Sequence, residues 1–246
     1  MNKLKLLLLA FTAILFTSCQ FSENLYINEN GSGKMEFAFD ASEFMTMMGD
    51  EMMGESEEAI DSVMNFKTLL EESKDSIAQL SPEQQEAFKA LENFSMRMVM
   101  NPESKEMKFD LFTQFEQVSE LQNMFDTMNQ IQQLEQNANA GDNPLSALNN
   151  SNTKMNYSFD GTTFIRSAEI IDQELHSKTV DSLTQAMTMF GTSKYKLNYH
   201  FPRKIKSVSN DKALFAQDSK SFVLEFGLSE YITNPEALNI TVVLED

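Results

Sequence analysis

Five methionines lie within one short stretch of the sequence, and their thioether groups are the first candidates for chemistry. The stretch FMTMMGDEMMG contains Met45, Met47, Met48, Met52 and Met53. Thioethers are soft ligands that suit Cu(I), so one hypothesis is a copper site. Methionine is also an adaptable filler of apolar surfaces, and the chain contains 17 of them. Ordinary core packing and an adaptable apolar groove are therefore the two alternatives to a copper site.

Histidine and cysteine, which often carry catalysis or hold metals, are sparse, with two histidines and one cysteine in the chain. Neither His176 nor His200 has a second histidine or a cysteine at ligand spacing, which argues against a zinc site. The sequence has no G-x-S-x-G nucleophile motif, and NENGSG lacks the alternating acids of a calcium loop. We therefore predict no cofactor and no enzymatic activity. A hydrolase assembled from residues distant in the sequence is kept as a further alternative.

The single cysteine follows a segment with the anatomy of a signal peptide. Lys3 and Lys5 precede an uncharged, mostly apolar run over residues 6–16, and two small residues follow it. A basic start, an apolar run and a small-residue exit are typical of a secretory signal, and the run is shorter than the roughly 20 residues of a membrane span. We predict that residues 1–18 are cleaved.

The stretch LFTSCQ resembles a bacterial lipobox, at which signal peptidase II cleaves before a cysteine that becomes lipidated. The resemblance implies a mature chain that starts at Cys19 and carries several acyl chains, which together anchor a protein firmly. The lipobox usually has leucine three places before the cysteine, where this chain has Phe16. Gln20 follows the cysteine in place of the aspartate that retains many Gram-negative lipoproteins in the inner membrane. We therefore expect a lipid-anchored protein of the cell envelope, in the outer membrane.

A second possible modification is suggested by Asp-Ser/Thr-apolar triplets. These are similar to the O-glycan acceptor pattern of some Gram-negative envelope proteins. The candidate acceptors all fall in segments for which we predict helices: Ser62, Ser76, Thr127 and Ser182.

The charge of the chain excludes one class of partner. Its formal net charge is −18, whereas nucleic-acid-binding proteins carry a basic footprint. Residues 194–220 reverse this balance, with seven basic residues against two acidic ones. This basic stretch could meet lipid headgroups, glycan acids or the acidic helices of the same protein, and we favour the last.

Three hairpins and several helices can be predicted from hydrophobic periodicity. Alternating apolar residues flank turns at NGSG, NPESKE and Asp160-Gly161, which predicts β-hairpins. Helical spacing or capping residues predict helices after Asp40, from about residue 59, from Ser81, over 115–134 and around 180–190. Residues 194–244 contain five strand-like segments divided by turn residues and predict an antiparallel meander.

These elements predict an α+β fold. Hairpins keep strands antiparallel, and amphipathic helices must cover one face of such a sheet. We expect a large curved antiparallel sheet with amphipathic helices packed on one face. Residues 19–24 form a lipidated tether in this scheme, and residues 25–246 form a single domain with a flexible loop near 137–152.

Two stretches, LYINENGSGKMEFAFDASEFM and YKLNYHFPRKIKSVSND, resemble those of uncharacterised envelope lipoproteins. The second also resembles LppM-type lipoprotein domains. The resemblance implies an antiparallel sheet with helices and no particular activity. The function we predict is a non-enzymatic lipoprotein that binds an apolar ligand or a protein partner in the envelope. A methionine-rich Cu(I)-binding protein is the alternative.

Overall fold

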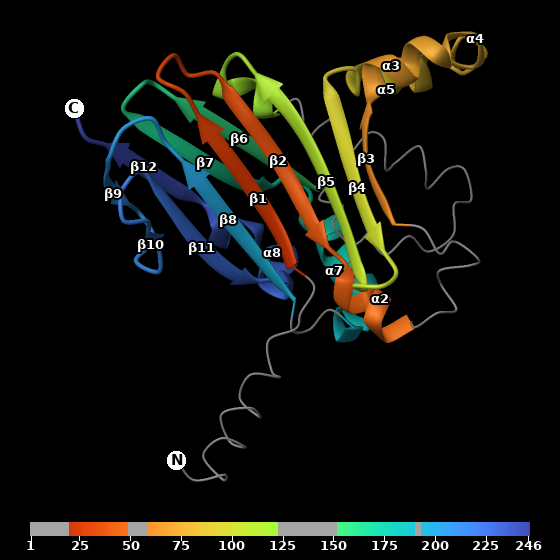
Figure 1. Ribbon diagram of the computed structural model, residues 1–246. Helices are drawn as coiled ribbons and strands as arrows, with labels where there is room; N and C mark the ends of the chain where they lie inside the picture. Colours follow the sequence, from red (N-terminus) through yellow and green to blue (C-terminus); the bar gives the residue numbers. More distant parts are fainter. Residues whose placement is uncertain (1–19, 49–58, 123–151, 190–192) are drawn as a thin grey trace.

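The structure, a computed structural model, describes residues 20–48, 59–122, 152–189 and 193–246 and contains two β-sheets (Figure 1). The larger sheet has eight strands in the order β10-β11-β8-β1-β2-β5-β4-β3. Their bounds are β1 Gln20–Ile27, β2 Gly33–Asp40, β3 Ile60–Asn65, β4 Phe94–Asn101, β5 Glu106–Phe115, β8 Lys194–His200, β10 Leu214–Phe215 and β11 Ser221–Gly227. The smaller sheet has the order β6-β7-β12-β9. Its strands are β6 Thr153–Phe159, β7 Thr163–Ile170, β9 Ile205–Val208 and β12 Ile240–Leu244.

The helices of the described residues gather at the two ends of the larger sheet. Figure 1 shows α3, α4 and α5 beyond one end of β3 and β4, and α2, α7 and α8 near the opposite end. The helices are α2 Ser42–Met48, α3 Phe66–Glu72, α4 Lys74–Ile77, α5 Pro82–Ala90, α7 Gln173–Met189 and α8 Leu228–Thr233, with short 3-10 turns η2 Val118–Glu120 and η4 Pro235–Leu238. None of the helices in this described part of the chain is long and apolar enough to cross a membrane.

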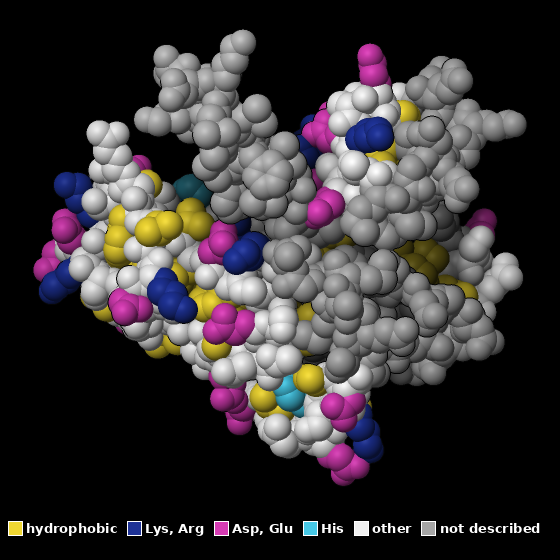
Figure 2. All heavy atoms as spheres, turned by 90° about the horizontal axis from the view of Figure 1, so that it is seen from below, with side chains coloured by type: hydrophobic (Ala, Val, Ile, Leu, Met, Phe, Trp, Pro, Cys, Tyr) yellow, Lys and Arg dark blue, Asp and Glu magenta, His cyan; other side chains and the backbone are white. Residues whose placement is uncertain are grey.

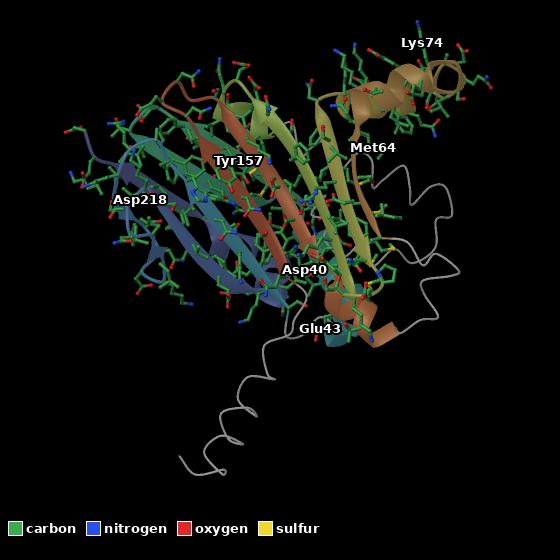
Figure 3. All side chains as sticks on the ribbon, in the orientation of Figure 1. Asp40, Glu43, Met64, Lys74, Tyr157 and Asp218 are labelled. Atoms are coloured by element: carbon green, nitrogen blue, oxygen red, sulfur yellow. The ribbon has the colours of Figure 1, made fainter. Side chains whose placement is uncertain are left out.

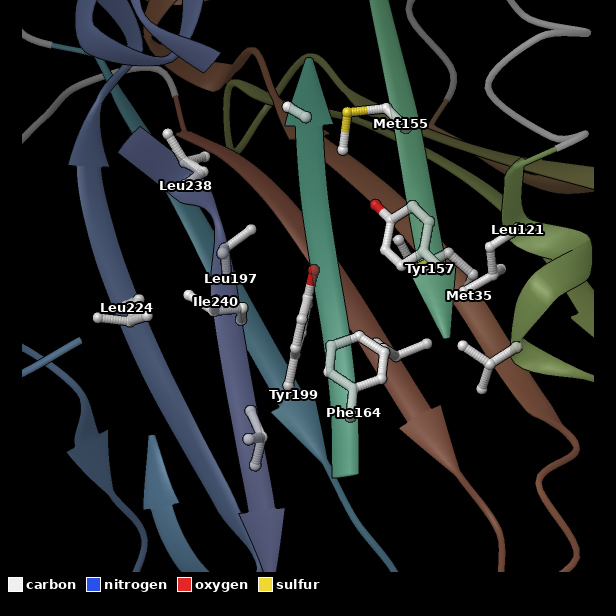
Figure 4. Packing of buried hydrophobic residues seen from close by; sticks show 14 of the residues in the cluster. Met35, Leu121, Met155, Tyr157, Phe164, Leu197, Tyr199, Leu224, Leu238 and Ile240 are labelled. Atoms are coloured by element: carbon white, nitrogen blue, oxygen red, sulfur yellow. The ribbon is translucent and has the colours of Figure 1, made fainter. Parts of the chain in front are cut away.

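The predicted α+β fold with one large sheet is confirmed, and two features go beyond the prediction. The larger sheet contains a parallel pair, because β1 runs alongside β8 with Gln20 opposite Lys194. The smaller sheet packs against β1 and β8, where its ring contacts include Phe164 edge-on to Tyr199 at 5.6 Å (Figure 4). Part of the apolar face is thus covered by a second sheet.

The hairpin turns and the helix cap that the sequence predicts are present in the structure. Gly31 and Gly161 both have positive φ at the tips of their hairpins, at 82° and 92°. Ser81 and Gln84 form the reciprocal hydrogen bonds of a capping box at the start of α5. Gly33 has a different role, since a Cβ there would lie 2.0 Å from the carbonyl oxygen of Tyr26. Glycine is therefore required by close packing at this position.

The predictions for three segments are wrong. Residues 194–244, expected to form one meander, are divided between the two sheets, because β9 and β12 pair in the smaller one and α8 and η4 lie between β11 and β12. Residues 20–24, expected to be a tether, belong to β1, because Phe21, Glu23 and Leu25 all point into the core. The residues from 60 to 65, expected to start a helix, form the edge strand β3, which pairs with β4 over its whole length. The helix begins only at Phe66, where the Asn65 side chain accepts a hydrogen bond from the Thr68 amide at 3.3 Å.

Other predicted segments fall partly outside the described residues. The expected helix over 115–134 begins instead as the end of β5, with Phe115, followed by the 3-10 turn η2. Three parts of these predictions lie outside the described residues: residues 123–134, nearly all of the loop predicted near 137–152, and the lipidation residue Cys19.

The two sheets are joined by a buried charge pair. Glu23 on β1 and Arg166 on β7 have side chains that are 0% and 1% exposed. Arg166 Nε and Nη2 each donate to a different carboxylate oxygen of Glu23, both at 3.2 Å. The third nitrogen, Nη1, donates to the Leu238 carbonyl at 3.0 Å.

Three tyrosines complete the surroundings of the Glu23 carboxylate. The Tyr157 hydroxyl donates at 2.9 Å and the Tyr195 hydroxyl at 3.0 Å, and Tyr199 donates a further short hydrogen bond. Burial raises the pKa of all three phenols well above the ordinary value, and the charge of Glu23 adds to the effect. They therefore remain protonated donors, which a buried carboxylate requires.

Removing one partner of this pair should destabilise the protein strongly. Arg166→Met leaves the Glu23 carboxylate buried without its counter-ion, which costs about 3–5 kcal/mol in comparable pairs. The free energy of unfolding in urea measures this loss. The double variant Glu23→Leu, Arg166→Met should recover part of this loss, because no charge remains buried.

The control is Lys178→Met in the exposed Glu174–Lys178 pair, where a loss of about 0.5 kcal/mol or less is expected. Equal losses in Arg166→Met and Lys178→Met would contradict this role.

Candidate ligand-binding face

One face of the larger sheet changes from buried to half-buried between β1 and β5. On β1, β8 and β11 the inward side chains are buried, as Leu25, Leu197 and Leu224 show with 0% exposure each. On β2, β5, β4 and β3 most inward side chains are half-buried. We call the latter set the open face, and it consists of Phe37, Phe39, Ile60, Met64, Met96, Met98, Met100, Met107, Phe109 and Leu111.

The open face arises because the two sheets differ in width. Strands lie about 4.8 Å apart, so four strands cannot cover eight. The buried pair between β1 and β7 sets the smaller sheet over one side of the larger one. Figure 1 shows β5, β4 and β3 extending beyond the smaller sheet on the other side. The open face is thus the part of the apolar surface that the smaller sheet does not reach.

Strand alternation gives the open face its composition. In the hairpin of β4 and β5, Met96 lies opposite Leu111, Met98 opposite Phe109 and Met100 opposite Met107. These are the pairs that the sequence pattern predicts for one side of this hairpin. Side chains directly opposite in an antiparallel pair are close enough to pack together. The hairpin therefore presents a continuous surface of thioether, phenyl and aliphatic groups.

The open face is continuous with the core. Phe109 stacks near Phe39 with ring centroids 6.4 Å apart, and Phe39 stacks on the buried Phe21 at 4.4 Å. At the far edge, Met64 on β3 lies opposite Met96. Figure 3 shows Met64 on β3 and Tyr157 within the body between the sheets. An apolar ligand on the open face would therefore rest against packed aromatic rings.

The opposite face of the same strands carries the charges. Arg97 on β4 forms a two-point contact with Asp61 on β3, at 2.9 and 2.8 Å. On β2, Lys34 pairs with Glu36 at 2.5 Å. Burial raises the pKa of Asp110 on this outer face, and Glu36 contributes to the shift. This separation gives β2, β5, β4 and β3 one charged face towards water and one apolar face.

The composition of the open face restricts its chemistry. It carries no acid, base or nucleophile apart from the Ser62 hydroxyl on the edge strand, opposite Met98. Thioether and phenyl groups bind by dispersion and by removal of apolar area from water. Methionine adapts its shape readily, which suits ligands of variable shape. The arrangement therefore fits binding of an apolar group.

The structure places the predicted site residues in several different locations. Of the Cu(I) alternative, it describes the side chain of Met45 alone, which is 5% exposed in α2. The side chains of Met47, Met48, Met52 and Met53 lie outside the described residues. Among the residues that are described, no group of three or more His, Cys, Asp or Glu is placed to hold a metal ion.

Two of the four predicted O-glycan acceptors can be placed. Ser62 is exposed on β3 and Ser76 is exposed on α4. Ser62 was expected in a helix, and its position on a strand is a correction that follows from the pairing of β3 with β4. Thr127 and the Ser182 side chain lie outside the described residues.

The two histidines have separate environments. His176 is 5% exposed, with Nδ1 3.2 Å from the Asn152 amide nitrogen and Nε2 3.1 Å from the Thr233 carbonyl. His200 stacks on Tyr26 on the outer face, at 4.5 Å between ring centroids, and burial lowers its pKa. His176 in α7 thus contacts Asn152, the residue before β6, and Thr233 at the end of α8.

Sequence reasoning missed the Glu23–Arg166 pair. The available signal was the strand pattern itself, since Glu23 stands between Phe21 and Leu25 on the apolar side of an alternating segment. Arg166 stands in the same way between Phe164 and Ala168. A charge in each of two inward rows indicates a buried pair.

Comparison with known proteins identifies no family. No protein-family model matches the sequence, and no curated protein matches it. Among solved structures, the folded domain of Mycobacterium tuberculosis LppM, determined by NMR, is similar over 94% of each chain, with 7% sequence identity and a TM-score of 0.41.

Methionine oxidation should follow the boundary of the open face. Limited hydrogen peroxide should first form sulfoxides at the open-face methionines Met96, Met98, Met100 and Met107. Met35 and Met155 should react later, because they are only 0% and 6% exposed. Peptide mapping by mass spectrometry measures the rate at each position. Equal rates for the open-face methionines and Met35 would show that the open face is closed in solution.

Proposed function

We propose that this protein is an envelope lipoprotein, anchored in the outer membrane through Cys19, that binds the acyl chain of a lipid on its open face. The observation that carries the proposal is the open face itself. It joins ten apolar side chains on four strands, all half-buried, and it lies opposite a face that carries the charges. A continuous apolar surface that is only partly covered is typical of a binding site.

An acyl chain fits the open face better than a ligand with a fixed polar pattern. Specific recognition of polar groups requires placed donors and acceptors, whereas the open face supplies thioether, phenyl and aliphatic groups with the Ser62 hydroxyl at its edge. A flexible methylene chain needs only apolar contact area, at about 0.8 kcal/mol for each buried CH₂ group. We therefore expect weak discrimination between chains of different length or unsaturation.

Binding of a fatty acid tests the ligand part of the proposal. The fluorescence of cis-parinaric acid should rise on addition of the full mature chain, and unlabelled palmitate should reverse the rise. Met98→Glu should weaken binding at least about tenfold, because an acyl chain cannot compensate a carboxylate that it desolvates. The matched control is Val99→Glu, the next residue on β4, whose side chain points to the charged face.

Two results would contradict this assignment. One is an unchanged fluorescence in the presence of a folded protein. The other is equal binding by Met98→Glu and Val99→Glu, which would place the ligand elsewhere. A co-purifying protein that Met98→Glu releases, without fatty-acid binding by the wild type, would assign the open face to a protein partner instead.

The anchor is tested separately. Cys19→Ser in the full-length precursor should move the protein from the membrane fraction to the soluble fraction, because the thioether-linked acyl chains provide the attachment. Intact-mass measurement of the wild type should show a mature chain that begins at Cys19 with added acyl mass. A mature N-terminus at another residue would overturn the anchor.

A further inference from the structure

One edge of the molecule is built by a single basic segment that connects the two sheets. We call residues 203–220 the basic edge, and this segment leads through β9 and contains β10. It is fixed by backbone hydrogen bonds, with the Ile205 amide donating to the Ser219 carbonyl at 2.8 Å. The Ala216 amide likewise donates to the Ser221 carbonyl at 2.9 Å. The basic edge is therefore an ordered surface on which both sheets end.

Two large apolar side chains on the basic edge are exposed on opposite faces of β10, and the ring centroid of Phe215 lies 6.4 Å from that of the buried Phe222. Leu214 is 72% exposed and Phe215 is 49% exposed. Leu214 lies opposite Val223, which is itself 37% exposed on the outer face. Figure 2 shows hydrophobic side chains gathered on the side of the molecule where β10 and β11 lie, with basic and acidic side chains around them.

The charge around these two residues is opposite to that of the protein. The segment has Arg203, Lys204, Lys206, Lys212 and Lys220 against Asp211 and Asp218. Arg203 and Lys220 bind backbone carbonyls, of Glu245 and Pro202 among others. The ammonium groups of Lys204, Lys206 and Lys212 are exposed, and they make no hydrogen bond or ion pair within the described residues.

In the part of the chain that the structure describes, Lys204, Lys206 and Lys212 pair with none of the acidic helices, which was the favoured prediction. Within the whole basic stretch, Lys194 and Lys196 do find an acid, but it is Glu225 on the neighbouring strand β11. Lysines also protect a short edge strand from pairing with other chains. That protective role is served by charge alone, and it does not explain an exposed leucine and phenylalanine at the same edge.

We propose that the basic edge contacts the surface of an anionic membrane edge-on, so that Leu214 on one face of β10 and Phe215 on the other are both inserted at the level of the headgroups. Lysine near an anionic bilayer gains about 1 kcal/mol per residue, and exposed apolar side chains between basic residues are the usual arrangement of an interfacial contact. The contact is independent of any lipid on Cys19 and of any ligand on the open face.

The position of the basic edge is compatible with an anchor at the N-terminus, on the premise of the proposed function. Leu214, Val223, Asn198 and Asn24 form one row across β10, β11, β8 and β1. Asn24 is four residues from Gln20, so Leu214 lies on the order of 20 Å from the start of β1. Two attachments at this separation would hold β10 towards the bilayer. The open face lies towards the opposite edge strand, β3, and would then be clear of the membrane.

Vesicle sedimentation tests the contact without the anchor. The full mature chain with Cys19→Ser is mixed with vesicles of phosphatidylcholine, with or without phosphatidylglycerol. It should sediment with the anionic vesicles alone, and added salt should release it, because salt screens exposed charges. Leu214→Ser, Phe215→Ser and the triple variant Lys204→Gln, Lys206→Gln, Lys212→Gln should each lower the partition coefficient, the triple variant at least about tenfold.

Two matched controls locate the effect. Ile171→Ser removes an apolar side chain that is 60% exposed away from the basic edge, and Lys178→Gln removes an exposed charge on α7. Both should leave vesicle binding unchanged. Binding of cis-parinaric acid should be unchanged in all of these variants, so failure of this proposal is distinguishable from failure of the proposed function.

Three outcomes would overturn the proposal. The first is no sedimentation with anionic vesicles. The second is binding that survives both the Leu214→Ser, Phe215→Ser and the triple lysine changes. The third is self-association, seen by analytical ultracentrifugation and abolished by Leu214→Ser, without vesicle binding, which would assign the basic edge to a second copy of the chain.

Discussion

The buried pair of Glu23 and Arg166 is the interaction on which the arrangement of the two sheets depends. Each sheet contributes one charge to its inner face, and neither charge is exposed by more than 1%. An isolated buried charge costs several kcal/mol, so the sheets can pack favourably only in the alignment that brings the two side chains together. The three tyrosines and the Leu238 carbonyl then satisfy the remaining hydrogen-bonding groups. The main effect of the pair is therefore to fix how the two sheets are aligned, rather than to raise the free energy of unfolding.

That alignment leads directly to the open face. With the smaller sheet fixed over β1, β8 and β11, the apolar side chains of β2, β5, β4 and β3 lie beyond its edge. The charged side chains of these strands point the other way, so the open face keeps an apolar character across four strands. Its methionines can adapt to a ligand. The binding function that we propose is thus a consequence of unequal sheet widths and a fixed alignment.

Short-range features of the fold could be predicted from the sequence, and long-range ones could not. The hairpin turns at Gly31 and Gly161 and the capping box of Ser81 depend on a few adjacent residues. The parallel pairing of β1 with β8 joins segments more than 170 residues apart, and no local pattern encodes it.

Residues 60–65 have apolar positions that fit both helical and strand spacing, and only the partner strand β4 decides between them. The tether prediction failed because Glu23, which stands in a short polar stretch, is buried against Arg166. The methionine face of β4 and β5 was predictable, whereas its exposure depends on where the smaller sheet ends.

The most direct test of this account is NMR of the protein labelled with ¹³C at the methionine methyl groups, with and without palmitate. The account predicts that the signals of Met96, Met98, Met100 and Met107 shift on addition of palmitate. The signals of Met35 and Met155, which are buried in the core, should remain in place. Shifts confined to other methionines, or unchanged spectra at saturating palmitate, would contradict the claim that the open face is the binding site.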